Sequence, residues 1–185
     1  MNKAIGIVES ISIARGIEAA DGMVKVAPVK LFVARTICPG KFLILIGGDV
    51  EAVNSSVERG KEILGEFMVD NVVIPNVHEN VLLALEATTE IKNVERQWAL
   101  GVIETYSVTA CIYAADAAVK AGGVNLIEIR PAVGLGGKSF VTMIGDVSAV
   151  ESAVNAGKDN VGEEGMILNF AVIPYISEDV LEKLI

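Results

Sequence analysis

Apolar runs and amphipathic stretches alternate along the first half of the chain. Residues 3–9 alternate small and apolar side chains and predict a strand. Ser12 then suits the N-cap of a helix that ends at Pro28. The next two apolar runs, 29–34 and 42–46, are rich in Val, Ile, Leu and Phe and predict two buried strands of a hairpin.

A second helix and a further strand complete the pattern of this half. Asp49 suits the N-cap of the helix, because apolar residues follow it at helical spacing. Residues 68–74 predict a strand, and residues 77–85 predict a short amphipathic helix after it. The polar stretch 88–97 has little periodicity and predicts a linker.

After this linker the chain repeats itself. Residues 4–9 (AIGIVE) recur as residues 99–104 (ALGVIE), and residues 73–75 (VIP) recur unchanged as residues 172–174. Several such matches in the same order predict a duplication. Each copy is expected to be an α/β unit with the order strand, helix, strand, strand, helix, strand, helix.

The repeat sets the expected domain boundaries and shows where the copies differ. We place the first domain at residues 1–87, the linker at 88–97 and the second domain at 98–185. The hairpin loop of the first copy holds Cys38, whereas the matching loop of the second copy, residues 131–136, is two residues longer and has no cysteine.

Composition narrows the possible partners and the compartment. The chain has 185 residues and a net charge of −9, which argues against binding to nucleic acid or to an anionic membrane. Its apolar content of 52% is high, yet no apolar run approaches the roughly 20 residues of a membrane span, so assembly is the better explanation. No signal-peptide pattern opens the sequence, so we expect a cytoplasmic protein whose Cys38 and Cys111 are reduced thiols.

Cys38 stands in a turn that should project from the hairpin. Pro39 cannot donate to a strand ladder, and Gly40 can adopt the positive φ of a tight reversal. One cysteine cannot hold an iron–sulfur cluster or a structural zinc, because these normally take three or four protein ligands. Further ligands would have to come from other copies of the chain, and a simple loop thiol remains the alternative.

The other candidate residues favour structural roles. A Gly-Lys pair in the second hairpin resembles the end of a phosphate-binding loop, but that motif needs a glycine where Ala132 stands and a helix where a strand is predicted. His78 is the only histidine and is expected at the surface in the first turn of a helix, while Cys111 is expected in the core. Glu9 and Glu104 end equivalent strands, which fits a repeated structural contact better than acid–base catalysis.

The repeated unit resembles the bacterial microcompartment shell domain. The resemblance rests on the AIGIVE strand, on Asp21-Gly22-Met23-Val24-Lys25 at the end of the first helix, on the Gly-Lys hairpin and on Gly-Asp-Val before the second helix. The tandem order and the Cys38 loop are most similar to tandem-domain shell proteins of propanediol-utilising compartments. The resemblance implies two ferredoxin-like domains, each with a mainly antiparallel sheet and flanking helices. It also implies a structural protein, not an enzyme, whose three chains form a flat pseudohexagonal tile that joins other shell proteins.

The resemblance further implies roles for particular residues. Cys38 from three chains would hold one [4Fe–4S] cluster per trimer, open to a non-protein ligand, sensitive to air and able to pass electrons to an enclosed redox enzyme. Lys25 and Lys120 would lie at tile edges. The loops around the central pore would contain Thr36, Ile37, Pro39, Gly40, Val133, Gly134, Leu135 and Gly136. These loops lack the Gly-Ser-Gly pattern common in single-domain shell proteins, which argues against a simple metabolite pore. A small-molecule-binding regulator with its ligand between the two halves is the alternative function.

Overall fold

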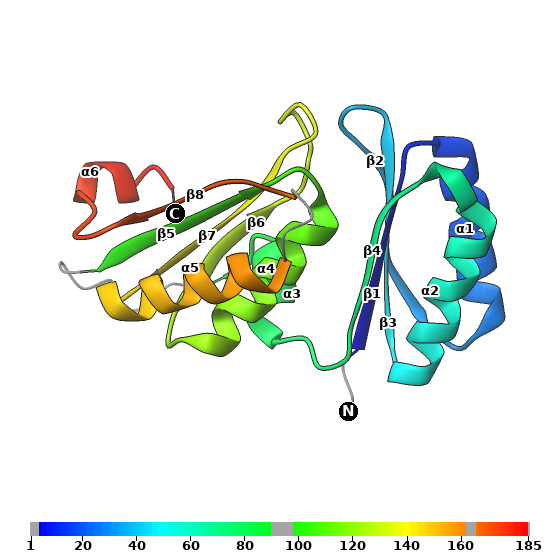
Figure 1. Ribbon diagram of the computed structural model, residues 1–185, viewed down its shortest axis with the longest axis horizontal. Coiled ribbons are helices and arrows are strands. Elements are labelled where there is room, and N and C mark those ends of the chain that lie inside the picture. Colours follow the sequence, from blue (N-terminus) through cyan, green and yellow to red (C-terminus); the bar gives the residue numbers. More distant parts are fainter. Residues whose placement is uncertain (1–3, 90–97, 162–165, 185) are drawn as a thin grey trace. The chain divides into compact units, whose positions relative to one another are not determined.

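The computed structural model describes residues 4–89, 98–161 and 166–184, and their contacts divide the chain into two units (Figure 1). The unit boundaries do not follow the sequence repeat. The first unit combines Met1–Val77 with two short segments from the second copy, Ser107–Thr109 and Ala132–Gly137. The second unit contains His78–Tyr106, Ala110–Pro131 and Lys138–Ile185.

The first unit is an antiparallel sheet covered on one face by two helices (Figure 1). The strand order is β2-β3-β1-β4. The strands are β1 (Ala4–Ser10), β2 (Lys30–Ile37), β3 (Lys41–Gly48) and β4 (Met68–Ile74), and the helices are α1 (Ile13–Val26), α2 (Val50–Leu64) and the short 3-10 helix η1 (Gly65–Phe67).

Alternation along β1 separates the two faces of this sheet. Ala4 and Val8 belong to the core beneath the helices, and a Cβ added at Gly6 would lie 2.6 Å from Val57 of α2. Because side chains alternate along a strand, Glu9 projects from the opposite face. β1 thus joins the core on one side to a buried carboxylate on the other.

Helix α1 begins and ends where the sequence predicts. The Ser12 side chain is the N-cap and accepts the backbone N–H of Arg15 at 3.3 Å. Ala27 is extended, as expected for a residue that precedes Pro28. Asp49 is the N-cap residue of α2, also as predicted, although its side chain makes no capping hydrogen bond.

The second unit repeats the same sheet, in the order β6-β7-β5-β8. Its strands are β5 (Ala99–Thr105), β6 (Asn125–Arg130), β7 (Ser139–Gly145) and β8 (Ile167–Ile173). The helices are α3 (Glu79–Leu85), α4 (Val108–Ala121), α5 (Val147–Val161) and α6 (Glu178–Leu181), and the first two residues of α4 group with the first unit. Helix α3 continues the first repeat in sequence but contacts β6, so it groups with the second sheet. The predicted fold, two tandem ferredoxin-like α/β domains with antiparallel sheets and flanking helices, is confirmed.

Strand β2 is more exposed than the sequence predicts. The prediction that strand 29–34 is buried is wrong, because β2 lies at the edge of its sheet and most of its residues, including Leu31 and Phe32, are exposed. Most of the predicted linker, residues 90–97, lies outside the described residues. Within the part of the chain that the structure describes, no helix is long and apolar enough to span a membrane.

The close approach of Gly6 to α2 predicts a steric effect on stability. Gly6→Ala would place a methyl group 2.6 Å from Val57 and 2.9 Å from Val53, so we expect a loss of about 1–3 kcal/mol in the free energy of unfolding. The control is Gly123→Ala, because a Cβ there meets nothing within 4 Å. Urea unfolding measures both variants, and equal stabilities would contradict the expected packing.

Candidate functional site: the Cys38 loop and the Glu9 carboxylate

Cys38 lies in the tight turn between β2 and β3. Strand β2 ends at the buried Ile37, and Gly40 reverses the chain with a φ of 82°, which favours glycine. The Gly40 N–H donates to the Ile37 carbonyl at 3.0 Å, and the Cys38–Pro39 peptide bond is cis. The turn is therefore closed by its own backbone and holds the half-buried thiol in place.

A second loop of the same unit lies against this turn (Figure 1). The Cys38 N–H donates to the Ala132 carbonyl at 2.6 Å, and the Gly134 N–H points at the Cys38 sulfur with an N–S distance of 3.4 Å. Gly134 has a φ of 74°, a conformation that glycine adopts readily. The structure thus brings two of the predicted loops together around the thiol.

The donor set of one chain is too small for a metal or a cluster. Across the described ranges, no group of three or more His, Cys, Asp or Glu residues could hold a metal ion. The Cys38 sulfur itself suits an iron ligand, because it is accessible and accepts a backbone N–H, a contact that tunes iron–sulfur centres. The residues therefore fit a cluster when equivalent thiols from other chains complete the ligand set.

Glu9, at the end of β1, is fully buried and still has two charged or polar partners. Its Oε1 accepts the backbone N–H of Thr109, in the first turn of α4, at 2.7 Å. Its Oε2 lies 3.4 Å from the Lys41 Nζ. The carboxylate therefore satisfies an open N–H at the start of a helix, where the helix dipole also favours negative charge.

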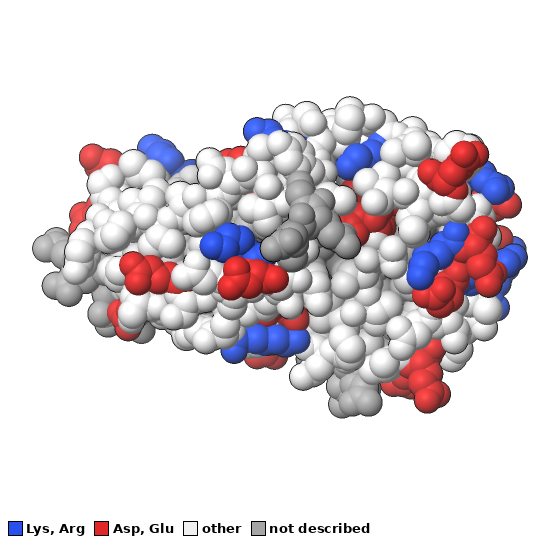
Figure 2. Space-filling view, in the orientation of Figure 1, with Lys and Arg blue, Asp and Glu red and all other residues white. Residues whose placement is uncertain are grey.

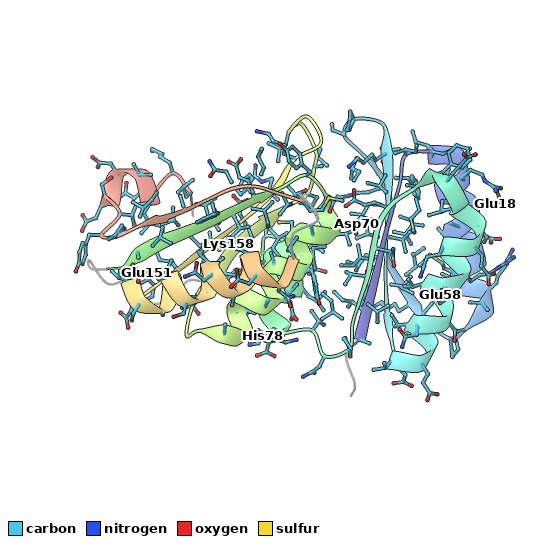
Figure 3. All side chains as sticks on the ribbon, in the orientation of Figure 1. Glu18, Glu58, Asp70, His78, Glu151 and Lys158 are labelled. Carbon is cyan, nitrogen blue, oxygen red and sulfur yellow. The ribbon has the colours of Figure 1, made fainter. Side chains whose placement is uncertain are left out.

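A second acidic side chain lies beside Glu9. Asp70 pairs with Glu9 across β1 and β4 and projects from the face of the sheet opposite α1 and α2 (Figure 3). The Ser107 hydroxyl donates to the Asp70 Oδ2 at 2.5 Å. Burial raises the pKa of Glu9, and the nearby Asp70 adds to this, while the Thr109 N–H and Lys41 oppose it. This environment ties β1 and β4 to residues 107–109 of the same unit.

The two predicted edge lysines have different surroundings. Lys25 is exposed and pairs with the exposed Asp21 at 2.6 Å. Lys120 pairs at 2.5 Å with Asp116, which is buried and also accepts the backbone N–H of His78 at 2.8 Å. Lys120 therefore also compensates a buried charge, whereas Lys25 does not.

The remaining candidates have structural roles. His78 is the N-cap of α3, where its Nδ1 accepts the Asn80 N–H at 3.2 Å, so it precedes the first helical turn and is half-buried. Cys111 is buried, as predicted for a core residue. The Gly-Lys pair of the second hairpin is followed by strand β7, as predicted, and not by the helix that a phosphate-binding loop requires.

Asp70, Ser107 and Thr109 were missed by the sequence reasoning. Ser107 repeats the helix-capping Ser12, and that was a usable signal. The proximity of Asp70 to Glu9 depends on strand register, which the sequence pattern alone does not give.

The outer surface of α1 and α2 carries charges of both signs (Figure 2). Three ion pairs join residues three positions apart, namely Arg15–Glu18, Arg59–Glu62 and Lys61–Glu58. Such exposed pairs contribute little to stability, and their mixed signs do not form a basic patch for nucleic acid.

Comparison with known proteins agrees with this architecture. The model of the BMC domain matches residues 4–77 and 99–176. The chain is 44% identical to the bacterial microcompartment shell protein PduT of Citrobacter freundii, over 100% of this chain and 99% of that protein. It is 40% identical to the shell protein PduA of the same organism, over 49% of this chain and 94% of PduA. The crystal structure of a microcompartment protein from Desulfitobacterium hafniense superposes with a TM-score of 0.85 at 49% identity, covering 99% of both chains.

The raised pKa of Glu9 predicts a pH-dependent effect of Glu9→Gln. In the unfolded chain Glu9 ionises as the pH rises through its ordinary pKa of 4.5, whereas folded Glu9 holds its proton until the pH reaches the raised pKa. Between these two pKa values, the free energy of unfolding of the wild type therefore falls relative to that of Glu9→Gln as the pH rises. The urea midpoint of Glu9→Gln, measured relative to that of the wild type, should increase from pH 4 to pH 8. A difference that is constant or moves the opposite way would contradict the raised pKa.

Proposed function

The chain belongs to the BMC-domain family of bacterial microcompartment shell proteins, and from this premise we propose that three copies form a pseudohexagonal tile that binds one [4Fe–4S] cluster through Cys38. The observation that carries the cluster proposal is the Cys38 thiol, held at a closed turn with the Gly134 N–H directed at its sulfur. The tile itself is a structural part of the shell.

The number of chains follows from the duplication. A chain with two similar but unequal domains can close a ring of six domain positions only as three chains. A three-fold axis brings three copies of any residue beside it together, so one thiol per chain supplies the three protein ligands of a cubane cluster. The second copy has no cysteine in its loop, which leaves the ligand number at three.

The bound cluster would supply one-electron transfer through the shell to an enclosed redox enzyme. The turn would hold each sulfur toward the axis, and the Gly134 N–H would stabilise its negative charge. Because one iron would lack a protein ligand, we expect the cluster to be lost in air.

The proposed tile meets other shell proteins at its edges. Lys25 suits this role, because its side chain is exposed in the last turn of α1. The tile would enclose a compartment within the cytoplasm. Membership of a structural family favours this function over the small-molecule regulator.

Cys38→Ser tests the cluster. The variant should form the same trimer by light scattering but lose the iron and the visible absorption of anaerobically reconstituted protein, because the change removes a ligand from a turn and leaves the core intact. Cys111→Ser is the matched control and should keep its iron, since that thiol is buried in α4. Reconstituted wild-type protein without bound iron would refute the cluster.

Lys25→Glu tests the edge contact. We expect intact trimers that no longer form sheets in electron micrographs, because the charge at the edge is reversed. Lys61→Glu is the control, since Lys61 also lies in the last turn of a helix and forms an exposed pair. Lys120→Glu is less informative because it also leaves the buried Asp116 without its cation. Sheets formed by Lys25→Glu as readily as by the wild type would exclude the contact.

A further inference from the structure

The second half of the chain carries an uncovered copy of the Glu9 site. Glu104 ends β5 as Glu9 ends β1, and each strand has a register shift immediately after its glutamate. Glu9 pairs across its sheet with Asp70, and Glu104 pairs in the same way with Asn169. Glu9 is 0% exposed, whereas Glu104 remains partly exposed.

The start of α4, which covers Glu9, also has an exposed counterpart at the start of α1. Thr109 contacts Glu9 from the first turn of α4, and Ala14 occupies the repeated position in α1. The apolar residues next to these two positions also differ in their exposure to solvent. Val108 and Ile112 of α4 are both 0% exposed, whereas their counterparts in α1, Ile13 and Ile17, are 40% and 56% exposed.

We infer that the start of α1 in one chain docks against Glu104 in a second copy of the chain. The backbone N–H of Ala14 donates to the Glu104 carboxylate, and Ser12 faces Asn169 of that copy, as Thr109 and Ser107 contact Glu9 and Asp70 within one chain. This contact rests on the proposed ring. Its two surfaces differ, and a head-to-tail contact between unlike surfaces gives a finite assembly only when the chains close into a ring.

The chemistry of the two surfaces is complementary. The first turn of α1 has no acidic residue, so its dipole and open N–H groups favour a carboxylate. Asn169 replaces Asp70, which removes the second negative charge from the neighbourhood of Glu104. Ile13 and Ile17 supply apolar area, whose burial is the main driving force of association.

The in-chain contact provides a matched control for a cross-linking test. Ser107 and Asp70 touch through their side chains at 2.5 Å, so Ser107→Cys with Asp70→Cys should close a disulfide within one chain. Ser12→Cys with Asn169→Cys should instead give covalent dimers and trimers on a non-reducing gel. Both pairs are made with Cys38→Ser, so that the remaining native thiol is the buried Cys111.

The outcomes separate the docking contact from the ring. If light scattering shows trimers and the in-chain pair closes but the Ser12–Asn169 pair gives monomers alone, the docking contact is wrong and the ring stands. If the unmodified protein is monomeric by light scattering, the ring is wrong and the contact fails with it. Covalent trimers support both.

A dissociation measurement tests Glu104 itself. Glu104→Ala should raise the protein concentration at which trimers dissociate by roughly tenfold or more, because an N–H then loses a charged acceptor. Glu104→Gln keeps an acceptor oxygen and should have a smaller effect. Glu151→Ala, on the exposed surface of α5, should have none (Figure 3). Equal dissociation of Glu104→Ala and Glu151→Ala would overturn the role of Glu104.

Discussion

The buried carboxylate of Glu9 constrains the arrangement of the first unit. Removing a carboxylate from water is costly, and Lys41 and the Thr109 N–H lower this cost without cancelling it, because burial still raises the pKa of Glu9. The helix that supplies this N–H belongs to the second copy in sequence. The contact therefore fixes residues 107–109 in the first unit, and the boundary between the copies is not a boundary between units.

The duplicated copies share one strand order and differ in which of their helix side chains are buried. The sheets share their register around Glu9 and Glu104. Their helices differ, since Asp116 is buried beside the backbone of His78, whereas its counterpart Asp21 is exposed to solvent. The two copies have thus diverged in which helix side chains are buried, while the strand order of each sheet is unchanged.

Periodicity predicted the elements, because strands and helices repeat their apolar side chains with different periods, and recurring segments predicted the duplication. Periodicity did not predict which strands are buried. It failed for β2, since an apolar run does not say whether its strand is central or at an edge. It also missed the contact between Cys38 and Gly134, which are 96 positions apart in sequence. Such a contact depends on how two hairpin loops meet, and neither loop carries that information alone.

A site that takes one residue from each chain makes ligand binding depend on assembly. In the proposed tile, three Cys38 thiols are adjacent only when the ring is closed, so the free energy of cluster binding also favours the closed ring. The proposed contacts around Glu104 favour the same closed ring, so they would hold the ring together before iron arrives and would raise its affinity for the cluster. A shell tile with both features would remain closed when air removes the cluster, and its thiols would stay placed to bind the cluster again.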